Sequence, residues 1–147
     1  MRQRPVNYLL LLLFIMLLSA CSPSSPVTVQ VDNVNARVEV ASTPNQRQRG
    51  LMHRQSLGKD EGMLMVFPTP QEVSMWMLNT KVPLDVGFFD QQGVLRSVVQ
   101  MQPDGGKQLY HSPPQTLYAL EMNRGWFDRY ALVPGARLKL PYALTAE

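Results

Sequence analysis

The sequence predicts a small, mainly β domain, a single antiparallel β-sandwich or barrel-like fold with one short N-terminal helix packed on it. Short apolar and β-branched runs recur along the chain, and several alternate with polar residues at the period of two that half-buried strands show. Proline, glycine and polar turn residues separate these runs, as in small sandwiches and barrels. One stretch, Thr43–Gln46, has instead the pattern of a helix start.

The expected strands are short and bounded by turn residues. They lie at residues 27–31, 36–41, 63–67, 74–78, 84–90, 94–101, 116–122 and 136–142. Asp90–Gly93 is expected to be a hairpin loop in which Gly93 supplies a positive φ. Residues 102–115 are expected to form a loop, and Trp126–Tyr130 a short helical turn.

The expected helix begins at a capping box. Thr43 is its N-cap, Pro44 takes the first helical position, and Gln46 stands three residues after the cap. The helix would run to about residues 52–54, with Leu51 and Met52 toward the core.

The first 20 residues have the features of a lipoprotein signal peptide. Their apolar stretch, Leu9–Leu18, is shorter than the roughly 20 residues that span a bilayer, but it suits a signal peptide. The Leu-Ser-Ala-Cys sequence at Leu18–Cys21 resembles the bacterial lipoprotein signal, in which the Cys is lipidated and becomes the new N-terminus. The alternative is a plain signal peptide with an incidental cysteine. The chain thus divides into a signal peptide (1–20), the lipidated Cys21 with a tether (21–26) and one β-rich domain (27–147).

Cys21 is the only cysteine of the chain, and the membrane is its expected partner. Diacylglycerol on its sulfur and an acyl chain such as palmitate on its amine would anchor the protein stably, because stable attachment needs more than one chain. No thiol then remains for a disulfide, a nucleophile or a metal. Position 22 is Ser rather than the Asp of the enterobacterial inner-membrane retention signal, so we expect the outer membrane, facing the periplasm.

The charge of the chain argues against a nucleic-acid partner. Without Arg2 and Arg4 of the signal peptide, 12 Lys and Arg stand against 11 Asp and Glu, so the mature chain is about neutral. A nucleic-acid-binding domain would show a clustered excess of basic charge, and no such excess is visible in the sequence. No cofactor is expected either.

Two carboxylates, Asp85 and Glu121, lie within apolar runs that should be buried. A buried carboxylate is costly unless it is paired and hydrogen-bonded. Arg47, Arg49 and Arg54 cluster on or beside the expected helix, and a guanidinium can bind a carboxylate through two hydrogen bonds. We therefore expect Asp85 or Glu121 to pair with Arg49 or Arg54.

This pair has two interpretations. It is a structural tie between helix and sheet, with Asn79 and Thr80 satisfying backbone groups in a turn before Pro83, or it is part of a ligand pocket beside Trp76. In the second case a small polar or anionic ligand meets an arginine there. The candidate ligand-binding residues are Arg49, Arg54, Trp76, Asn79, Thr80, Asp85 and Glu121.

A hydrolase-like enzyme is an alternative function, with Asp85 or Glu121 as general base. It requires a carboxylate with a raised pKa in an open pocket. Neither His53 nor His111 stands in a recognisable serine or metal motif, since the chain has no GxSxG and no HExxH.

A Cu(I) site is a second alternative, on the two Met-x-Met pairs. In a strand, Met63 would share a face with Met65, and Met75 with Met77. Thioethers together with His53 would suit Cu(I). Methionine is also an adaptable core residue, and on that interpretation no metal is bound.

Four motifs occur together in the chain, namely RQRGLMHR (47–54), GMLMVF (62–67), WMLNTKVPLD (76–85) and LEMNRG (120–125). In order and spacing they resemble the family called domain of unknown function 192 (uncharacterised protein family 0127), over about residues 28–142. The resemblance implies a compact β-rich domain, often secreted or lipid-anchored, and no established activity. The family pattern usually has Lys where this chain has Leu78. If that Lys supplies a charge to a ligand site in the relatives, this chain lacks the charge. Alternatively, position 78 is an exposed strand position at which the substitution does not affect function.

Taken together, these features favour a lipid-anchored periplasmic domain with a noncatalytic role. That role is small-ligand binding, or envelope support through contacts with other envelope proteins.

Overall fold

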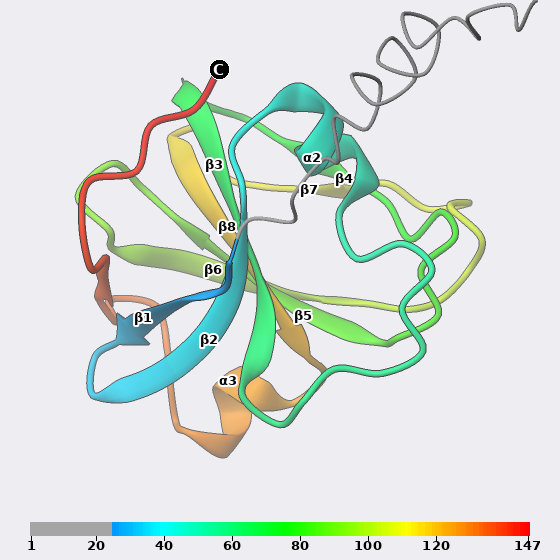
Figure 1. Cartoon of the computed structure of the whole chain (residues 1–147), viewed down its shortest axis with the longest axis horizontal. Coiled ribbons are helices and arrows are strands. Elements are labelled where there is room, and N and C mark those ends of the chain that lie inside the picture. Colours follow the sequence, from blue (N-terminus) through cyan, green and yellow to red (C-terminus); the bar gives the residue numbers. More distant parts are fainter. Residues whose placement is uncertain (1–24) are drawn as a thin grey trace, which may run out of the picture.

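The computed structural model describes residues 25–147, which form one curled β-sheet and a small separate ribbon (Figure 1). The predicted signal peptide and Cys21 lie outside these residues. The elements are β1 (Val27–Val31), β2 (Val34–Ala41), α2 (Pro44–Arg49), β3 (Glu61–Gln71), β4 (Ser74–Met75), β5 (Leu84–Phe89), β6 (Leu95–Met101), β7 (Tyr110–His111), β8 (Thr116–Asn123), α3 (Trp126–Arg129) and β9 (Leu138–Lys139). No helix within residues 25–147 is long and apolar enough to cross a membrane.

The seven-stranded sheet has the order β6-β5-β8-β3-β2-β1-β9. Strands β2 and β3 pair in parallel, whereas the other pairs of this sheet are antiparallel. The prediction of an antiparallel domain was therefore wrong at this one pair. The physical reason is the connection, because residues 42–60 carry α2 and return to the same end of the sheet, which parallel pairing requires.

The sheet curls into a half-barrel rather than forming the two layers of a sandwich. Its edges meet at one corner, where the Leu95 N–H donates to the Ala136 carbonyl and the Leu138 N–H to the Gly93 carbonyl, both at 2.8 Å. Gly93 has the positive φ that its hairpin position predicted, +70°, and a Cβ there would lie 2.7 Å from the Leu138 carbonyl oxygen. Glycine is thus required where the edges meet.

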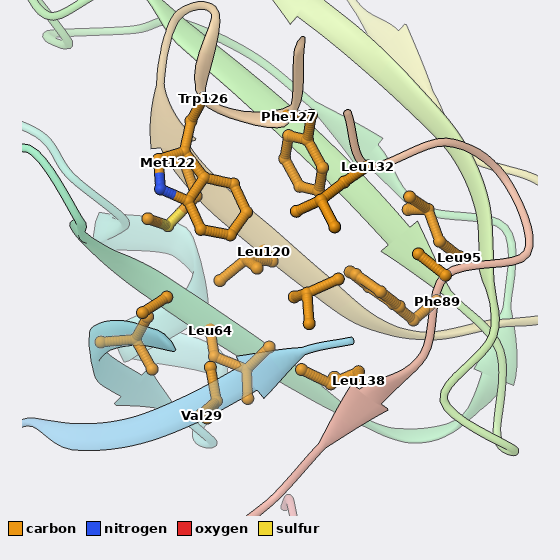
Figure 2. Close-up of a cluster of buried hydrophobic side chains, with 14 of the residues drawn as sticks. Val29, Leu64, Phe89, Leu95, Leu120, Met122, Trp126, Phe127, Leu132 and Leu138 are labelled. Atoms are coloured by element: carbon orange, nitrogen blue, oxygen red, sulfur yellow. The ribbon is translucent and has the colours of Figure 1, made fainter. Parts of the chain in front are cut away.

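The two faces of the sheet bury separate cores. Along β3, Leu64 and Val66 belong to one core, and Met63, Met65 and Phe67 belong to the other, as strand alternation dictates. The inner core lies within the curl, and Figure 2 shows part of it. It contains Val29, Val31, Ala36, Val38, Leu64, Val66, Phe89, Leu95, Leu120, Met122, Trp126, Phe127, Leu132, Ala136 and Leu138. The outer core contains Ala41, Leu51, Met63, Met65, Phe67, Met75, Met77, Val82, Leu84, Val86, Phe88, Met101, Tyr110 and Ala119.

Helix α2 begins as predicted but is shorter and buries none of its residues. Thr43 and Gln46 form the capping box, with the Gln46 N–H donating to Thr43 Oγ1 at 3.3 Å and the Thr43 N–H to Gln46 Oε1 at 3.1 Å. The helix stops before Gly50, so Leu51 reaches the outer core from a turn instead. The expectation of one helix packed on the sheet is accordingly corrected to two short helices, α2 and α3.

Two of the expected strands are reduced to short pieces. Of residues 74–78 only β4 remains extended, and it pairs with β7, which lies in the segment expected to be a loop. The chain leaves β4 for a turn in which Thr80 N–H donates to the Met77 carbonyl at 3.2 Å and Asn79 has φ +52°. Of residues 136–142 only β9 is a strand.

Candidate functional site

The carboxyl group of Glu121 is the most unusual buried group of the described chain. Glu121 lies in the middle of β8, opposite Met63 of β3 and Val86 of β5, and therefore faces the outer core. The residue is 4% exposed, and its Oε2 has no hydrogen-bond partner. Burial raises the pKa of Glu121 to about 8, because removal from water disfavours the charged form. At neutral pH the group is mainly an uncharged carboxylic acid.

A cavity of about 310 Å³ lies over Glu121, between the turn after α2 and strand β4. Its volume is at the lower end of the range of small-molecule sites, roughly 300–1,000 Å³. The walls are largely apolar and include Leu51, Met65, Phe67 and Met75. The cavity therefore combines apolar walls with one unpartnered polar group.

Gly50 allows the chain to pass close over Glu121. Its φ is +47°, with ψ −135°, a conformation that side chains other than glycine rarely adopt. A Cβ on Gly50 would lie 3.3 Å from Met65 Cε and 3.6 Å from Glu121 Oε2. The helix end thus forms one wall of the cavity, and glycine at position 50 adds no side chain beside the carboxyl group.

Two arginines line the cavity, and only one of them has a free guanidinium. Arg47 donates to the carbonyls of Ser42 (2.6 Å), Val66 (2.9 Å) and Glu147 (2.8 Å), and it stacks 5.5 Å from the centre of the Phe67 ring. The guanidinium of Arg49 makes no hydrogen bond or ion pair within residues 25–147, and the residue is exposed. Arg47 therefore supports the fold, and Arg49 is available to a ligand.

The other candidate residues of the 76–80 segment divide between the cavity and the fold. Trp76 lines the cavity and is 42% exposed, so it stands at the rim. Thr80 also lines it, but its hydroxyl donates to the Leu78 carbonyl at 3.2 Å. Asn79 is not part of the lining, and its carbonyl accepts from the His53 N–H at 2.9 Å. Leu78, where the family pattern has Lys, is 41% exposed and does not line the cavity.

Asp85 lies on the opposite side of the sheet and has a structural partner. Its Oδ2 accepts from the Gly125 N–H at 2.8 Å, at the start of α3. Burial, above all, raises the pKa of Asp85 as well, while the hydrogen bond from Gly125 opposes this. Asp85 Oδ1 has no partner. Asp85 therefore fixes the backbone of Gly125, the residue at which α3 begins, from another strand.

The expected pairing of Asp85 or Glu121 with Arg49 or Arg54 is not formed. Arg54 instead pairs with Glu39, at 2.5 Å from Nη2 to Oε1, beside a separate cavity of about 110 Å³. The error has two causes. Asp85 faces the inner side of the sheet, where it binds the Gly125 N–H. Near Glu121, Arg49 is exposed and Arg54 is held by Glu39.

Sequence reasoning missed two other carboxylates, one buried and one half-buried, that do have strong partners. Asp90, 3% exposed, accepts from Arg96 Nε at 2.7 Å. Asp60 accepts from Trp126 Nε1 at 3.1 Å and from the Tyr130 hydroxyl at 2.7 Å, and this Tyr130 hydrogen bond is the main reason that the pKa of Asp60 is lowered. In the sequence, the only sign that Asp60 or Asp90 binds a partner is its position in a turn next to a strand.

Met63 and Met65 share one face of β3, whereas Met77 lies beyond the end of β4, so Met75 and Met77 are not a pair on one strand. Met63, Met65, Met75 and Met77 all belong to the outer core, and only Met65 and Met75 line the cavity. His53 is exposed and outside the lining. Within residues 25–147, no group of three or more His, Cys, Asp and Glu side chains could hold a metal.

One serine and one histidine stand close together at the edge of the cavity. Ser74 Oγ lies 3.1 Å from His111 Nδ1, and the same nitrogen lies 3.4 Å from Glu72 Oε1. A Ser-His-acid relay needs the hydroxyl and the carboxylate on different ring nitrogens. The three residues are exposed on the β4–β7 ribbon, so this arrangement is a surface cross-strand contact rather than a nucleophilic centre.

The chain is similar to known proteins in sequence and in fold. The family model DUF192, described as "Uncharacterized ACR", matches residues 27–140. A structure from Sinorhizobium meliloti 1021, described as a candidate transcription regulator, has 32% identity and a TM-score of 0.74, covering 80% of this chain and 97% of its own. A protein of unknown function from Novosphingobium aromaticivorans DSM 12444 has 28% identity and a TM-score of 0.75, covering 81% of this chain and 90% of its own. No curated protein matched the chain.

Proposed function

This chain belongs to the DUF192 family, and we propose that its domain binds a small amphipathic anion, without catalysis, in the cavity over Glu121. The observation that carries the proposal is the unpartnered carboxyl of Glu121. A buried polar group without a hydrogen bond costs stability, commonly about 1–3 kcal/mol. Such a group beside a cavity with largely apolar walls has a physical purpose if a ligand supplies the missing partner.

Arg49 and Trp76 define the outer end of the proposed site. The free guanidinium of Arg49 offers paired donors to a carboxylate or phosphate. Trp76 adds an apolar surface beside it at the rim. A ligand with an anionic head and an apolar body fits this site, since its head would meet Arg49 at the mouth and its body would lie between the apolar walls above Glu121.

Phenylacetate is a suitable first probe because it has a carboxylate on a compact ring. We expect it to bind the wild-type domain in an NMR titration, and Arg49→Ala to weaken that binding about tenfold, the equivalent of a charge-assisted hydrogen bond. Arg54→Ala is the matched control, since Arg54 pairs with Glu39 outside the cavity. Equal weakening by both variants, or no effect of Arg49→Ala, would reject the proposal.

An enzymatic role is the second candidate, and it depends on the same carboxyl group. Glu121 has a raised pKa and lines an open cavity, so it would act as a general acid, being protonated at neutral pH. Asp85 is not proposed for this role because it faces α3. Substrate turnover that Glu121→Gln abolishes, with binding retained, would replace the binding role with catalysis. A Cu(I) site is not proposed. The four methionines belong to the outer core, and His53 does not line the cavity with Met65 and Met75.

We also propose that the domain is tethered to the outer membrane, facing the periplasm, through lipidated Cys21. The proposal rests on the lipoprotein-like sequence Leu18–Cys21. Cells labelled with radioactive palmitate should incorporate label into the wild-type protein and not into Cys21→Ser, and the label should fractionate with the outer membrane. Label in the Cys21→Ser variant, or none in the wild type, would contradict it. Contacts with other envelope proteins are compatible with this location.

A nucleic-acid partner is not proposed. The description of the Sinorhizobium protein as a candidate transcription regulator concerns that protein. The mature chain proposed here is about neutral, with 12 basic against 11 acidic residues, whereas nucleic-acid binding rests on basic patches.

A further inference from the structure

We infer that Glu121 recognises the inner end of the ligand as an uncharged carboxylic acid, so that the ligand carries a neutral, amide-like group opposite its anionic head. This inference rests on the proposed function and adds the chemical class of the ligand's second end. Two observations support the inference: the groups that surround the Glu121 carboxyl, and the kinds of ligand group that could hydrogen-bond to its unpartnered Oε2.

The surroundings of Glu121 offer it no counter-charge. Its register neighbours, Met63 on β3 and Val86 on β5, are apolar, and Gly50 contributes only backbone after α2. From β4, Ser74 and Met75 line the cavity, and Trp76 and Thr80 do so from the segment that follows. The two cations in the lining are Arg47, whose guanidinium is bound to backbone carbonyls, and Arg49 at the outer end. Burial alone accounts for the raised pKa of Glu121.

A cationic ligand end fits this environment poorly. An ammonium group at Glu121 would create an ion pair among apolar walls, where the desolvation of both charges offsets their attraction. The two arginines in the lining would also repel it. An ammonium group is therefore the less favourable partner.

A carboxylic acid and a primary amide complement each other without any charge. The acid donates through its hydroxyl and accepts at its carbonyl, and the amide offers one acceptor and one donor in the same plane. Two such hydrogen bonds would satisfy both oxygens of Glu121, including Oε2, which has no partner in the protein. The anionic head is then left for Arg49 at the mouth.

Three phenylacetates that differ only at the inner end test this inference by calorimetry at pH 6.5. They are 4-carbamoylphenylacetate, 4-isopropylphenylacetate, which has the same shape without hydrogen bonds, and 4-(aminomethyl)phenylacetate, which carries a cation. We expect the wild-type domain to bind the carbamoyl probe about tenfold more tightly than the isopropyl probe, since paired hydrogen bonds are worth roughly that factor.

Two variants of Glu121 complete the experiment. Glu121→Gln keeps the shape and both kinds of hydrogen-bonding group, so it should keep the preference for the carbamoyl probe. Glu121→Met removes them and should abolish the preference while still binding the isopropyl probe. Between pH 7 and 9 the affinity of the wild type for the carbamoyl probe should fall as Glu121 loses its proton, whereas that of Glu121→Gln should stay constant.

The outcomes separate this inference from the proposed function. If the wild type binds all probes equally, or Glu121→Met keeps the preference, the inference about Glu121 is wrong and anion binding at Arg49 stands. Tightest binding of the aminomethyl probe would mean that Glu121 acts as a carboxylate, which also overturns the inference. If no probe binds the folded wild type, the proposed function fails and the inference fails with it.

Discussion

Asp85 and Glu121 lie one register position apart on neighbouring strands and face opposite sides of the sheet. Asp85 of β5 is opposite Met122 of β8, and Glu121 is opposite Val86. The first carboxyl holds the start of α3, and the second lies under the cavity. Both are almost fully buried, yet their different partners give them separate roles that substitutions can distinguish.

Asp85→Ala should destabilise the domain without affecting probe binding. It leaves the Gly125 N–H without its acceptor, which should lower the free energy of unfolding by about 1–3 kcal/mol in urea denaturation. Asp85→Asn keeps an oxygen that can accept from the Gly125 N–H, so its free energy of unfolding should fall by less. An unchanged urea midpoint for Asp85→Ala would show that the contact with α3 does not support the fold.

Glu121→Gln should change how stability depends on pH. The pKa of Glu121 is about 8 in the folded protein and near the ordinary 4.5 in the unfolded chain, so the folded state keeps a proton that the unfolded state releases between these values. Wild-type stability therefore loses this contribution progressively as pH rises from 4.5 to 8. Asp85, whose pKa is also raised, contributes with the same sign.

The difference between Glu121→Gln and wild type isolates the contribution of Glu121. The variant should gain relative stability across that pH range, by up to about 3–5 kcal/mol, and the difference should be constant on either side of it. Urea denaturation at a series of pH values measures it. A difference that does not vary with pH would mean that Glu121 is ionised in the folded state.

Arg47→Met should reduce stability, whereas Arg49→Met should reduce binding. Arg47→Met keeps the apolar stem beside Phe67 but removes hydrogen bonds to three carbonyls, so thermal unfolding should reveal a loss of about 2–3 kcal/mol. Arg49→Met should change stability by less than about 0.5 kcal/mol and weaken phenylacetate binding. Similar losses of stability in both variants would contradict the division of roles.

Gly93→Ala should destabilise the closure of the sheet more than Gly105→Ala. The two glycines have nearly equal φ, +70° and +73°, so both substitutions carry the same backbone strain. Only at Gly93 would the new Cβ meet another atom, the Leu138 carbonyl oxygen at 2.7 Å, whereas Gly105 faces open space. We expect an extra loss of about 1–3 kcal/mol for Gly93→Ala. Equal unfolding free energies would show that the corner can relax.

The sequence by itself determined the mainly β class, the capping box of α2 and the hairpin at Gly93. Each of these is a local property, set by side-chain alternation, turn chemistry and one glycine. The alternation of Met63, Leu64, Met65 and Val66 likewise follows from the period of two. The four motifs also led to the family that the family model matches.

Only the tertiary structure decided which polar residues meet. The parallel β2–β3 pair depends on a crossover, and the curl depends on contacts between edges that are far apart in the sequence. Glu121 and Asp85 look alike in the sequence, because each is a carboxylate in an apolar run. A strand has two faces, however, and the pairing of β5 with β8 determines which face each carboxylate occupies. One carboxylate therefore binds the Gly125 N–H at the start of α3, and the other lies under a cavity.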